Sequence, residues 1–216
     1  NASAFSPDMK KIAINFFDRE AGRYKLGLWD IASKKRGMVF GGSGRSTIFS
    51  PDGKLVGYSI QDGGLEIGSV ETGKVIGMYC KEQQIENFNF APDSKTIAIV
   101  CEAGDGSHRH FVELWDIDSV RQLHVFQFER GTADVAAFSP DGKQLAIDAS
   151  ESRDDPPNAI TIWDIASKTK IQTLAGHIGR VKDVAYSPDG KWLASVGFDN
   201  VVRRWNTKTG IETADL

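Results

Sequence analysis

The sequence is poor in several features that would each point to a particular class of protein. It has two cysteines in 216 residues, Cys80 and Cys101, too few for the disulfide framework of a small secreted domain. Both lie in apolar stretches, so we expect free, buried thiols, with a single disulfide as the alternative. Lysine and arginine number 26 against 29 acidic residues. Without clustered, excess positive charge, the sequence argues against a nucleic-acid partner or an anionic membrane surface.

Long apolar runs are also missing. No run approaches the roughly 18 residues that a membrane-spanning helix needs, and no charged-then-apolar leader opens the chain. We therefore expect a soluble, cytoplasmic protein with no membrane partner. The chain starts at Asn1, directly before an expected strand, so we expect a segment of a longer protein. With 40% hydrophobic and 25% charged residues, such a chain can build an ordinary core without metals or other cofactors, and we expect none.

What the chain has in abundance is one repeated turn. It reads FSPDM, FSPDG, FAPDS, FSPDG and YSPDG, and its prolines follow one another at intervals of 44, 41, 48 and 48 residues. Proline presets φ at the second position of the turn and glycine accepts a positive φ at its end, so this chemistry is conformational. A repeat of this length predicts an architecture of stacked units. The five prolines are Pro7, Pro51, Pro92, Pro140 and Pro188.

Each copy is predicted to form four strands, from alternating apolar and polar residues and the turns between them. In the last copy these strands are Val181–Tyr186, Trp192–Val196, Val201–Trp205 and Ile211–Asp215. The first strand of the fourth copy, Val135–Phe138, is entirely apolar, which predicts the innermost, doubly covered position for the first strands. The third strand ends in a tryptophan in four copies, and Gly68 takes this place in the second copy. The four tryptophans are Trp29, Trp115, Trp163 and Trp205.

Four-stranded sheets repeated at this spacing are blades, which bury their faces by stacking radially. The predicted fold is therefore all-β, a β-propeller of four-stranded antiparallel blades with five blades in this chain. The pattern SPDGKxLA followed by WDI, with Gly176-His177 ahead of the last copy, resembles the WD-repeat β-propeller family over essentially the whole chain. The resemblance implies a larger propeller of about seven blades, and open blade edges that allow self-association. The blades are expected at approximately 1–40, 41–80, 81–128, 129–174 and 175–216.

The resemblance also implies a buried hydrogen-bonded set in the last copy, formed by His177, Ser195, Asp199 and Trp205. The other copies lack the Gly-His pair, and Trp29, Trp115 and Trp163 are expected to act there as structural core residues. A histidine, a serine and an aspartate could instead suggest a hydrolase triad. No G-x-S-x-G sequence surrounds the serine, so the structural interpretation is favoured.

Two further segments resemble ligand sites only superficially. The glycine-rich stretch Gly41 to Thr47 lacks the Gly-Lys-Ser/Thr ending of a phosphate-binding loop and precedes a strand rather than a helix. His108, Arg109 and His110, with Asp105 and Cys101 nearby, contain metal-ligating types, but no convincing set of four ligands. We therefore predict neither a phosphate loop nor a metal site, and no catalytic residue.

The copies differ most in the connection between their second and third strands. It is short in copies two and five and long in the other three, and all five connections lie at the same end of a propeller. Irregular loops on one face are where repeat proteins usually bind partners, although solvated loops without a role are the plain alternative. The candidate partner-binding residues are Arg19, Arg23, His108, Arg109, His110, Glu151, Asp154 and Asp155.

The function predicted from these observations is a non-enzymatic scaffold that presents this loop face to a protein or peptide partner. One alternative is a propeller enzyme or a propeller that binds a small molecule or metal where the blades converge. Another is a regulatory propeller segment of a multidomain enzyme. Fold alone does not decide among them, because one fold hosts many functions.

Overall fold

A computed structural model describes residues 3–42, 46–107, 109–128, 133–149 and 158–213. Throughout these ranges the fold is all-β, with five antiparallel sheets and no helix. The described residues thus contain no helix that could span a membrane. In each sheet the strands are joined in chain order, so every sheet is a meander.

The first two sheets each contain four strands. The first sheet contains β1 (Ser3–Phe5), β2 (Lys11–Asp18), β3 (Arg23–Asp30) and β4 (Arg36–Phe40). The second sheet contains β5 (Thr47–Phe49), β6 (Leu55–Ser59), β7 (Leu65–Ser69) and β8 (Val75–Tyr79).

The remaining sheets repeat the same order. The third sheet contains β9 (Gln84–Phe90), β10 (Thr96–Glu102), β11 (His110–Asp116) and β12 (Arg121–Gln127). The fourth contains β13 (Ala136–Phe138), β14 (Gln144–Ile147), β15 (Ile160–Asp164) and β16 (Thr169–Leu174). The fifth contains β17 (Val181–Tyr186), β18 (Trp192–Gly197) and β19 (Val202–Asn206).

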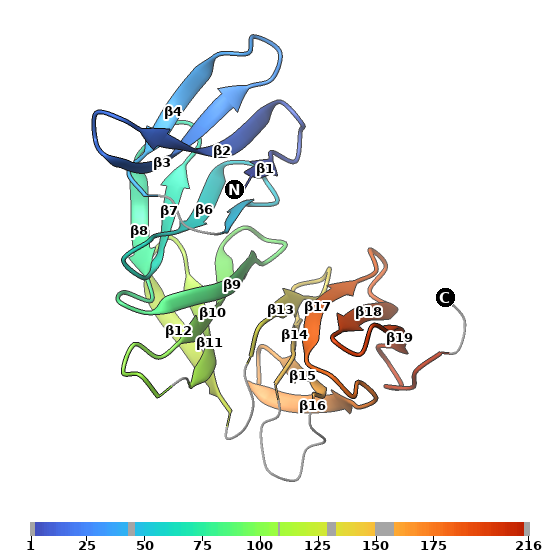
Figure 1. The fold of residues 1–216 in the computed structure, drawn as a ribbon. Coiled ribbons are helices and arrows are strands. Elements are labelled where there is room, and N and C mark those ends of the chain that lie inside the picture. Colours follow the sequence, from blue (N-terminus) through green and yellow to red (C-terminus); the bar gives the residue numbers. More distant parts are fainter. Residues whose placement is uncertain (1–2, 43–45, 108, 129–132, 150–157, 214–216) are drawn as a thin grey trace.

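The five sheets follow one another along an arc, with the first and the fifth at its two ends (Figure 1). First strands of neighbouring sheets contact one another, as β1 does β5 and β13 does both β9 and β17. These strands line the concave side of the arc, and the outer strands β4, β8, β12 and β16 lie on its convex side (Figure 1). The arrangement is that of successive propeller blades.

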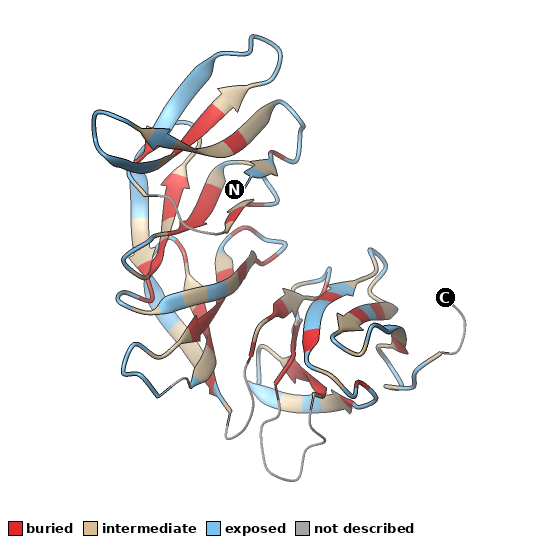
Figure 2. Cartoon of the chain, in the orientation of Figure 1, coloured by how far each residue is buried: buried red, intermediate tan, exposed pale blue. Residues whose placement is uncertain are grey.

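The core consists of four apolar layers, one between each pair of adjacent sheets. Between the third and fourth sheets, for example, Val100 and Leu114 pack with Leu145 and Trp163. Because side chains alternate between the two faces of a strand, each sheet that lies between two others supplies residues to two layers. Figure 2 accordingly shows buried residues concentrated on the middle strands, while the outer strands are mostly exposed or half-buried.

The repeated turn is held by its own serine and aspartate. In the first copy, Ser6 Oγ donates to Asp8 Oδ1 at 2.7 Å and accepts the backbone N–H of Lys11 at 2.8 Å. The copies that begin at Ser50, Ser139 and Ser187 repeat both bonds. The last position of the turn has a positive φ in all five copies, which explains why glycine occupies it in three of them. The serine and aspartate of the motif therefore fix the link between the first two strands in four of the five sheets.

The predicted fourth strand of the last copy, Ile211–Asp215, is not a strand in the described residues. Only an isolated bridge joins Trp205 to Glu212, with the N–H of Asn206 donating to Ile211 O and that of Thr213 to Arg204 O. Ile211 is 65% exposed. The described part of the fifth sheet therefore has three strands rather than four, and Ala214 and Asp215 of the predicted fourth strand lie outside the described residues.

Candidate functional site

The loop face predicted from the sequence lies at the end of the sheets where second strands connect to third strands. In the first sheet, Arg19 and Arg23 are both exposed there. In the third sheet Arg109 is also exposed, but its Nη2 lies 3.0 Å from Asp105 Oδ2 and its Nε donates to Ser107 Oγ. The guanidinium of Arg109 is therefore already paired within its own loop.

His110 differs from these arginines because it is half-buried in β11. Its Nδ1 lies 2.7 Å from the carbonyl oxygen of Ala133, in the segment that leads into the fourth sheet. This contact ties two sheets together. The remaining residues of the predicted face lie outside the described residues; they are His108, Glu151, Asp154 and Asp155.

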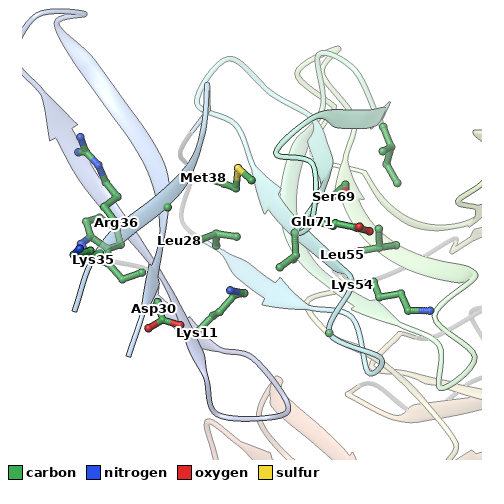
Figure 3. Close-up of a pocket in the computed structure, with 15 residues that line it drawn as sticks. Lys11, Leu28, Asp30, Lys35, Arg36, Met38, Lys54, Leu55, Ser69 and Glu71 are labelled. Atoms are coloured by element: carbon green, nitrogen blue, oxygen red, sulfur yellow. The ribbon is translucent and has the colours of Figure 1, made fainter. Parts of the chain in front are cut away.

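A groove of about 780 Å³ opens at the opposite end of the sheets, between the first and second sheets. Leu28 and Met38 line it from the first sheet, and Leu55, Val70 and Ile76 line it from the second. Figure 3 shows Leu28 and Met38 reaching from their strands toward the second sheet. Met38 is 37% exposed and Ile76 is 40% exposed, so the groove presents apolar side chains to solvent.

The groove also carries charge, and its lining is net positive. Its cationic side chains are Lys11, Lys35, Arg36 and Lys54, and its anionic ones are Asp30 and Glu71. Lys11 lies at the mouth between the two sheets, whereas Lys35 and Arg36 lie on the outer side of the first sheet (Figure 3). The backbone N–H and hydroxyl of Ser33 both donate to Asp30 at 2.7 Å and hold the pKa of that carboxyl below its usual value. No motif in the sequence indicated this site, because its residues come from two repeats.

The structure brings together the four residues of the set expected in the last copy. His177 Nδ1 lies 2.8 Å from Asp199 Oδ2, and His177 Nε2 lies 2.8 Å from Ser195 Oγ. Ser195 Oγ also accepts the indole N–H of Trp205 at 2.8 Å. Burial opposes ionisation of Asp199, but bonds from His177 and from backbone N–H groups outweigh it and lower its pKa. All four side chains are thus satisfied by one another inside the sheet.

The other tryptophans use different partners. Trp163 donates its indole N–H to Thr161 Oγ1 at 3.0 Å, and Trp115 donates to Glu113 Oε2 at 2.7 Å. Trp163 is 6% exposed, whereas Trp29 and Trp115 are only half-buried, less than expected of core residues. The structural place of the tryptophan is repeated, but its surroundings are not.

The second copy, which lacks the tryptophan, is filled from the neighbouring sheet. Phe40, the last residue of β4, is buried against Gly68, where an added Cβ would overlap the Phe40 ring. In the second and third sheets the corresponding residues, Tyr79 and Phe126, instead pack against the tryptophans of the next sheet, with ring centroids 5.5 Å and 4.9 Å apart. The glycine therefore leaves room for an aromatic ring from outside the copy.

A cluster that the sequence did not predict lies between the second and third sheets. Cys80 Sγ is 2.9 Å from Cys101 Sγ and 3.0 Å from Glu113 Oε2, and all three residues are buried. Both thiols are free. The hydrogen bond with Cys101, burial and the carboxylate of Glu113 raise the pKa of the Cys80 thiol. Of the residues considered near Cys101, His110 lies on the other face of the sheet, because Cys101 pairs with Phe111 while His110 pairs with Glu102. His108 lies outside the described residues.

One stretch of the chain matches a known family. Residues 168–206 match the family model described as WD domain, G-beta repeat, a range that spans β16 to β19. Together with the repeated antiparallel sheets, this match fits a WD-repeat, propeller-like protein. No curated protein matches the chain. WD repeats generally mediate interactions between proteins, and the family is typically a non-enzymatic scaffold.

Proposed function

We propose that this protein is a non-enzymatic scaffold that binds a protein partner through an extended segment seated in the groove between the first and second sheets. The observation that carries the proposal is the exposure of Met38 and Ile76 on the two walls of that groove. Apolar side chains lining a concave site with a few polar groups are typical of binding sites. The loop face with Arg19 and Arg23 remains the alternative surface.

The buried histidine set supports a scaffold rather than a hydrolase. Its distances resemble those of a catalytic triad, but Ser195 is 1% exposed and His177 is 5% exposed. The serine oxygen is also occupied by the indole N–H of Trp205. A nucleophile needs room for a substrate carbonyl beside its oxygen and donors for the oxyanion. Ser195 instead serves as a hydrogen-bonding centre inside the sheet.

The chemistry of the groove defines the partner segment. A bulky apolar side chain of the partner fits between Met38 and Val70. One or two carboxylates next to that side chain complement the positively charged lining, in which Lys11 lies at the mouth of the groove. Burying one such apolar side chain contributes about 1.5–3 kcal/mol, whereas an exposed ion pair contributes about 1 kcal/mol or less. The apolar anchor therefore determines the affinity, and the charges mainly select among partners.

A direct test uses a labelled synthetic peptide with a leucine-phenylalanine anchor flanked by aspartates, measured by fluorescence anisotropy. Two comparison peptides replace the anchor by alanines or the aspartates by lysines. Met38→Asp is expected to weaken binding by about tenfold or more, because it removes an apolar wall and adds repulsion. Lys11→Glu is expected to have a smaller effect that fades at high salt.

Matched controls come from other sheets. Ile171→Asp changes an exposed apolar residue of β16, and Lys208→Glu reverses an exposed charge near the end of the chain; both should leave the affinity unchanged. Equal binding of the three peptides, or equal binding by Met38→Asp and Ile171→Asp, would overturn the groove as the site. Loss of binding in Arg23→Glu with Met38→Asp unaffected would move the site to the loop face.

A further inference from the structure

We propose that Cys80, Cys101 and Glu113 form a binding site for one thiophilic divalent cation of the zinc class, a role independent of the partner groove. Their ligand atoms, two sulfurs and a carboxylate oxygen, all lie within 4.8 Å of one another. The residues come from three places in the chain, the end of β8, β10 and β11. A cation there would join the second sheet to the third.

The donor set selects the kind of ion. Thiolate and carboxylate ligands together suit zinc, whose bonds to sulfur are about 2.3 Å and to oxygen about 2.0–2.2 Å. Magnesium and calcium prefer six or more oxygen ligands and are disfavoured. Tetrahedral bonds of about 2.3 Å hold two sulfurs about 3.8 Å apart. The two sulfurs are 2.9 Å apart and Cys80 Sγ is 3.0 Å from Glu113 Oε2, so an entering ion would have to separate these atoms by roughly 0.5–1 Å. Three protein ligands leave one position of a tetrahedral ion for a small exogenous ligand.

The position of Glu113 gives the second argument. Its side chain is 5% exposed, and it contacts the Cys80 thiol and the Trp115 indole, neither of which is cationic. Among the described residues no lysine or arginine forms an ion pair with it. Buried carboxylates are usually paired with a cation or bound to a metal. A divalent ion would supply the missing positive charge.

The surroundings are already arranged as the second shell of a metal site. The indole N–H of Trp115 donates to Glu113 Oε2 at 2.7 Å, which fixes the orientation of the carboxylate. Apolar residues of the second and third sheets enclose the sulfurs, among them Tyr79 and Ile117. Cys80 itself has φ of 48°, a left-handed conformation uncommon for a residue with a side chain. Ligands held in place in this way lose little freedom when an ion binds.

The experiment titrates the reduced full chain, after treatment with a chelator, with Cd²⁺ and follows the ultraviolet charge-transfer band of cadmium thiolates. Competition with Zn²⁺ gives the zinc affinity, and thermal unfolding with and without Zn²⁺ gives an independent readout. We expect one ion per chain and a raised Tm, since a ligand that binds only the folded state stabilises it. Cys80→Ser and Cys101→Ser should each lose the band.

Graded variants separate this site from a simple pair of thiols. Glu113→Gln retains an acceptor for the Trp115 indole but loses the charge, and should weaken Zn²⁺ binding; Trp115→Phe should weaken it by about 10–100-fold. Glu66→Gln, at a carboxylate that accepts the Tyr58 hydroxyl in the second sheet, is the matched control and should bind as the wild type does. Should the cysteine variants fail to fold, protection of both wild-type thiols from alkylation by Zn²⁺ tests the same point.

Three results would overturn the proposal. One is the absence of both a cadmium band and a thermal shift in the reduced wild type. Another is an unchanged Zn²⁺ affinity in Glu113→Gln. The third is ready conversion of the two thiols to a disulfide by oxidised glutathione, with no Zn²⁺ affinity in the reduced form, which would identify a redox pair instead.

Discussion

Trp205 in the fifth sheet and Trp29 in the first sheet hold the same place in their repeats but have different surroundings. Trp205 is 1% exposed, packs against the fourth sheet and donates its indole N–H to Ser195. Trp29 is half-buried, lies over Gly27 and meets the ring of Phe16 edge-on, with centroids 5.7 Å apart. Its indole N–H has no hydrogen-bond acceptor among the described residues. The neighbouring sheet, rather than the motif, decides how much the tryptophan stabilises the fold.

The two tryptophans differ in burial because their rings lie on sheet faces with different neighbours. Trp205 faces the preceding sheet, and Trp163 does the same in the fourth sheet. Trp29 alternates along β3 with Leu26 and Leu28, which pack against the second sheet, so its ring is on the opposite face. That face is at the end of the arc in Figure 1. The same residue is therefore a core side chain in one repeat and part of an uncovered face in another.

The largest expected effect comes from replacing Trp205 by alanine, and the same substitution at Trp29 is the comparison. Trp205→Ala should lower the free energy of unfolding by about 3–5 kcal/mol, as is usual for large aromatic side chains in a core. Trp29→Ala should cost about 1 kcal/mol, the ordinary cost of a point substitution. Urea unfolding followed by far-ultraviolet circular dichroism measures both.

Trp192→Ala is the control for this pair, because Trp192 is a half-buried tryptophan in the same sheet as Trp205, with the guanidinium of Arg204 over its ring. Its effect should resemble that of Trp29→Ala. Equal losses for Trp205→Ala and Trp29→Ala would contradict the comparison. If the loss of unfolding free energy in Trp29→Ala grows with protein concentration, a second copy of the chain covers this face instead.

The repeats made most of the fold predictable. The serine and aspartate of each turn bond within a few residues of one another, and the alternation within strands is local, so both are legible in the sequence. The first three strands of the fifth copy, for instance, were predicted to within one residue at each end. The last strand of the fifth copy was predicted at 211–215, whereas the described residues 211–213 form only an isolated bridge with Trp205.

The sites were far less predictable, because they form between repeats. Met38 and Val70 line the groove from two different sheets, and no motif relates them. The cysteines lie 21 residues apart, and their contact depends on how the second and third sheets pack. Proximity in sequence brought only the combination of Cys101 with His110 into consideration, and that combination was set aside; alternation along β11 directs His110 to the other face.

The second prediction concerns a substitution that removes the shared hydrogen-bonding hydroxyl of the fifth sheet but keeps the Trp205 ring. Ser195→Ala leaves the Trp205 indole N–H and His177 Nε2 without their shared partner inside the sheet. At about 1–3 kcal/mol for each unsatisfied buried group, the loss of stability should be about 2–4 kcal/mol. Chemical denaturation measures it. As a control, Ser167→Ala removes an exposed serine bonded to Asp164 and should cost no more than a few tenths of a kcal/mol. A similar cost for Ser195→Ala and Ser167→Ala would mean that the buried set adds little stability.

The third and smallest effect concerns the repeat that has no tryptophan at all. Gly68→Ala places a methyl group inside the contact distance of the Phe40 ring, so the ring must shift and the expected cost is about 1–3 kcal/mol of overpacking. Adding Phe40→Leu should recover part of this loss, since the smaller side chain makes room for the methyl group. Gly41→Ala has no atom within 4 Å of the new methyl group and should be nearly neutral in the same thermal unfolding assay. If Gly68→Ala is as harmless as Gly41→Ala, then Phe40 does not occupy the place of the missing tryptophan, and the second repeat is held by its strands alone.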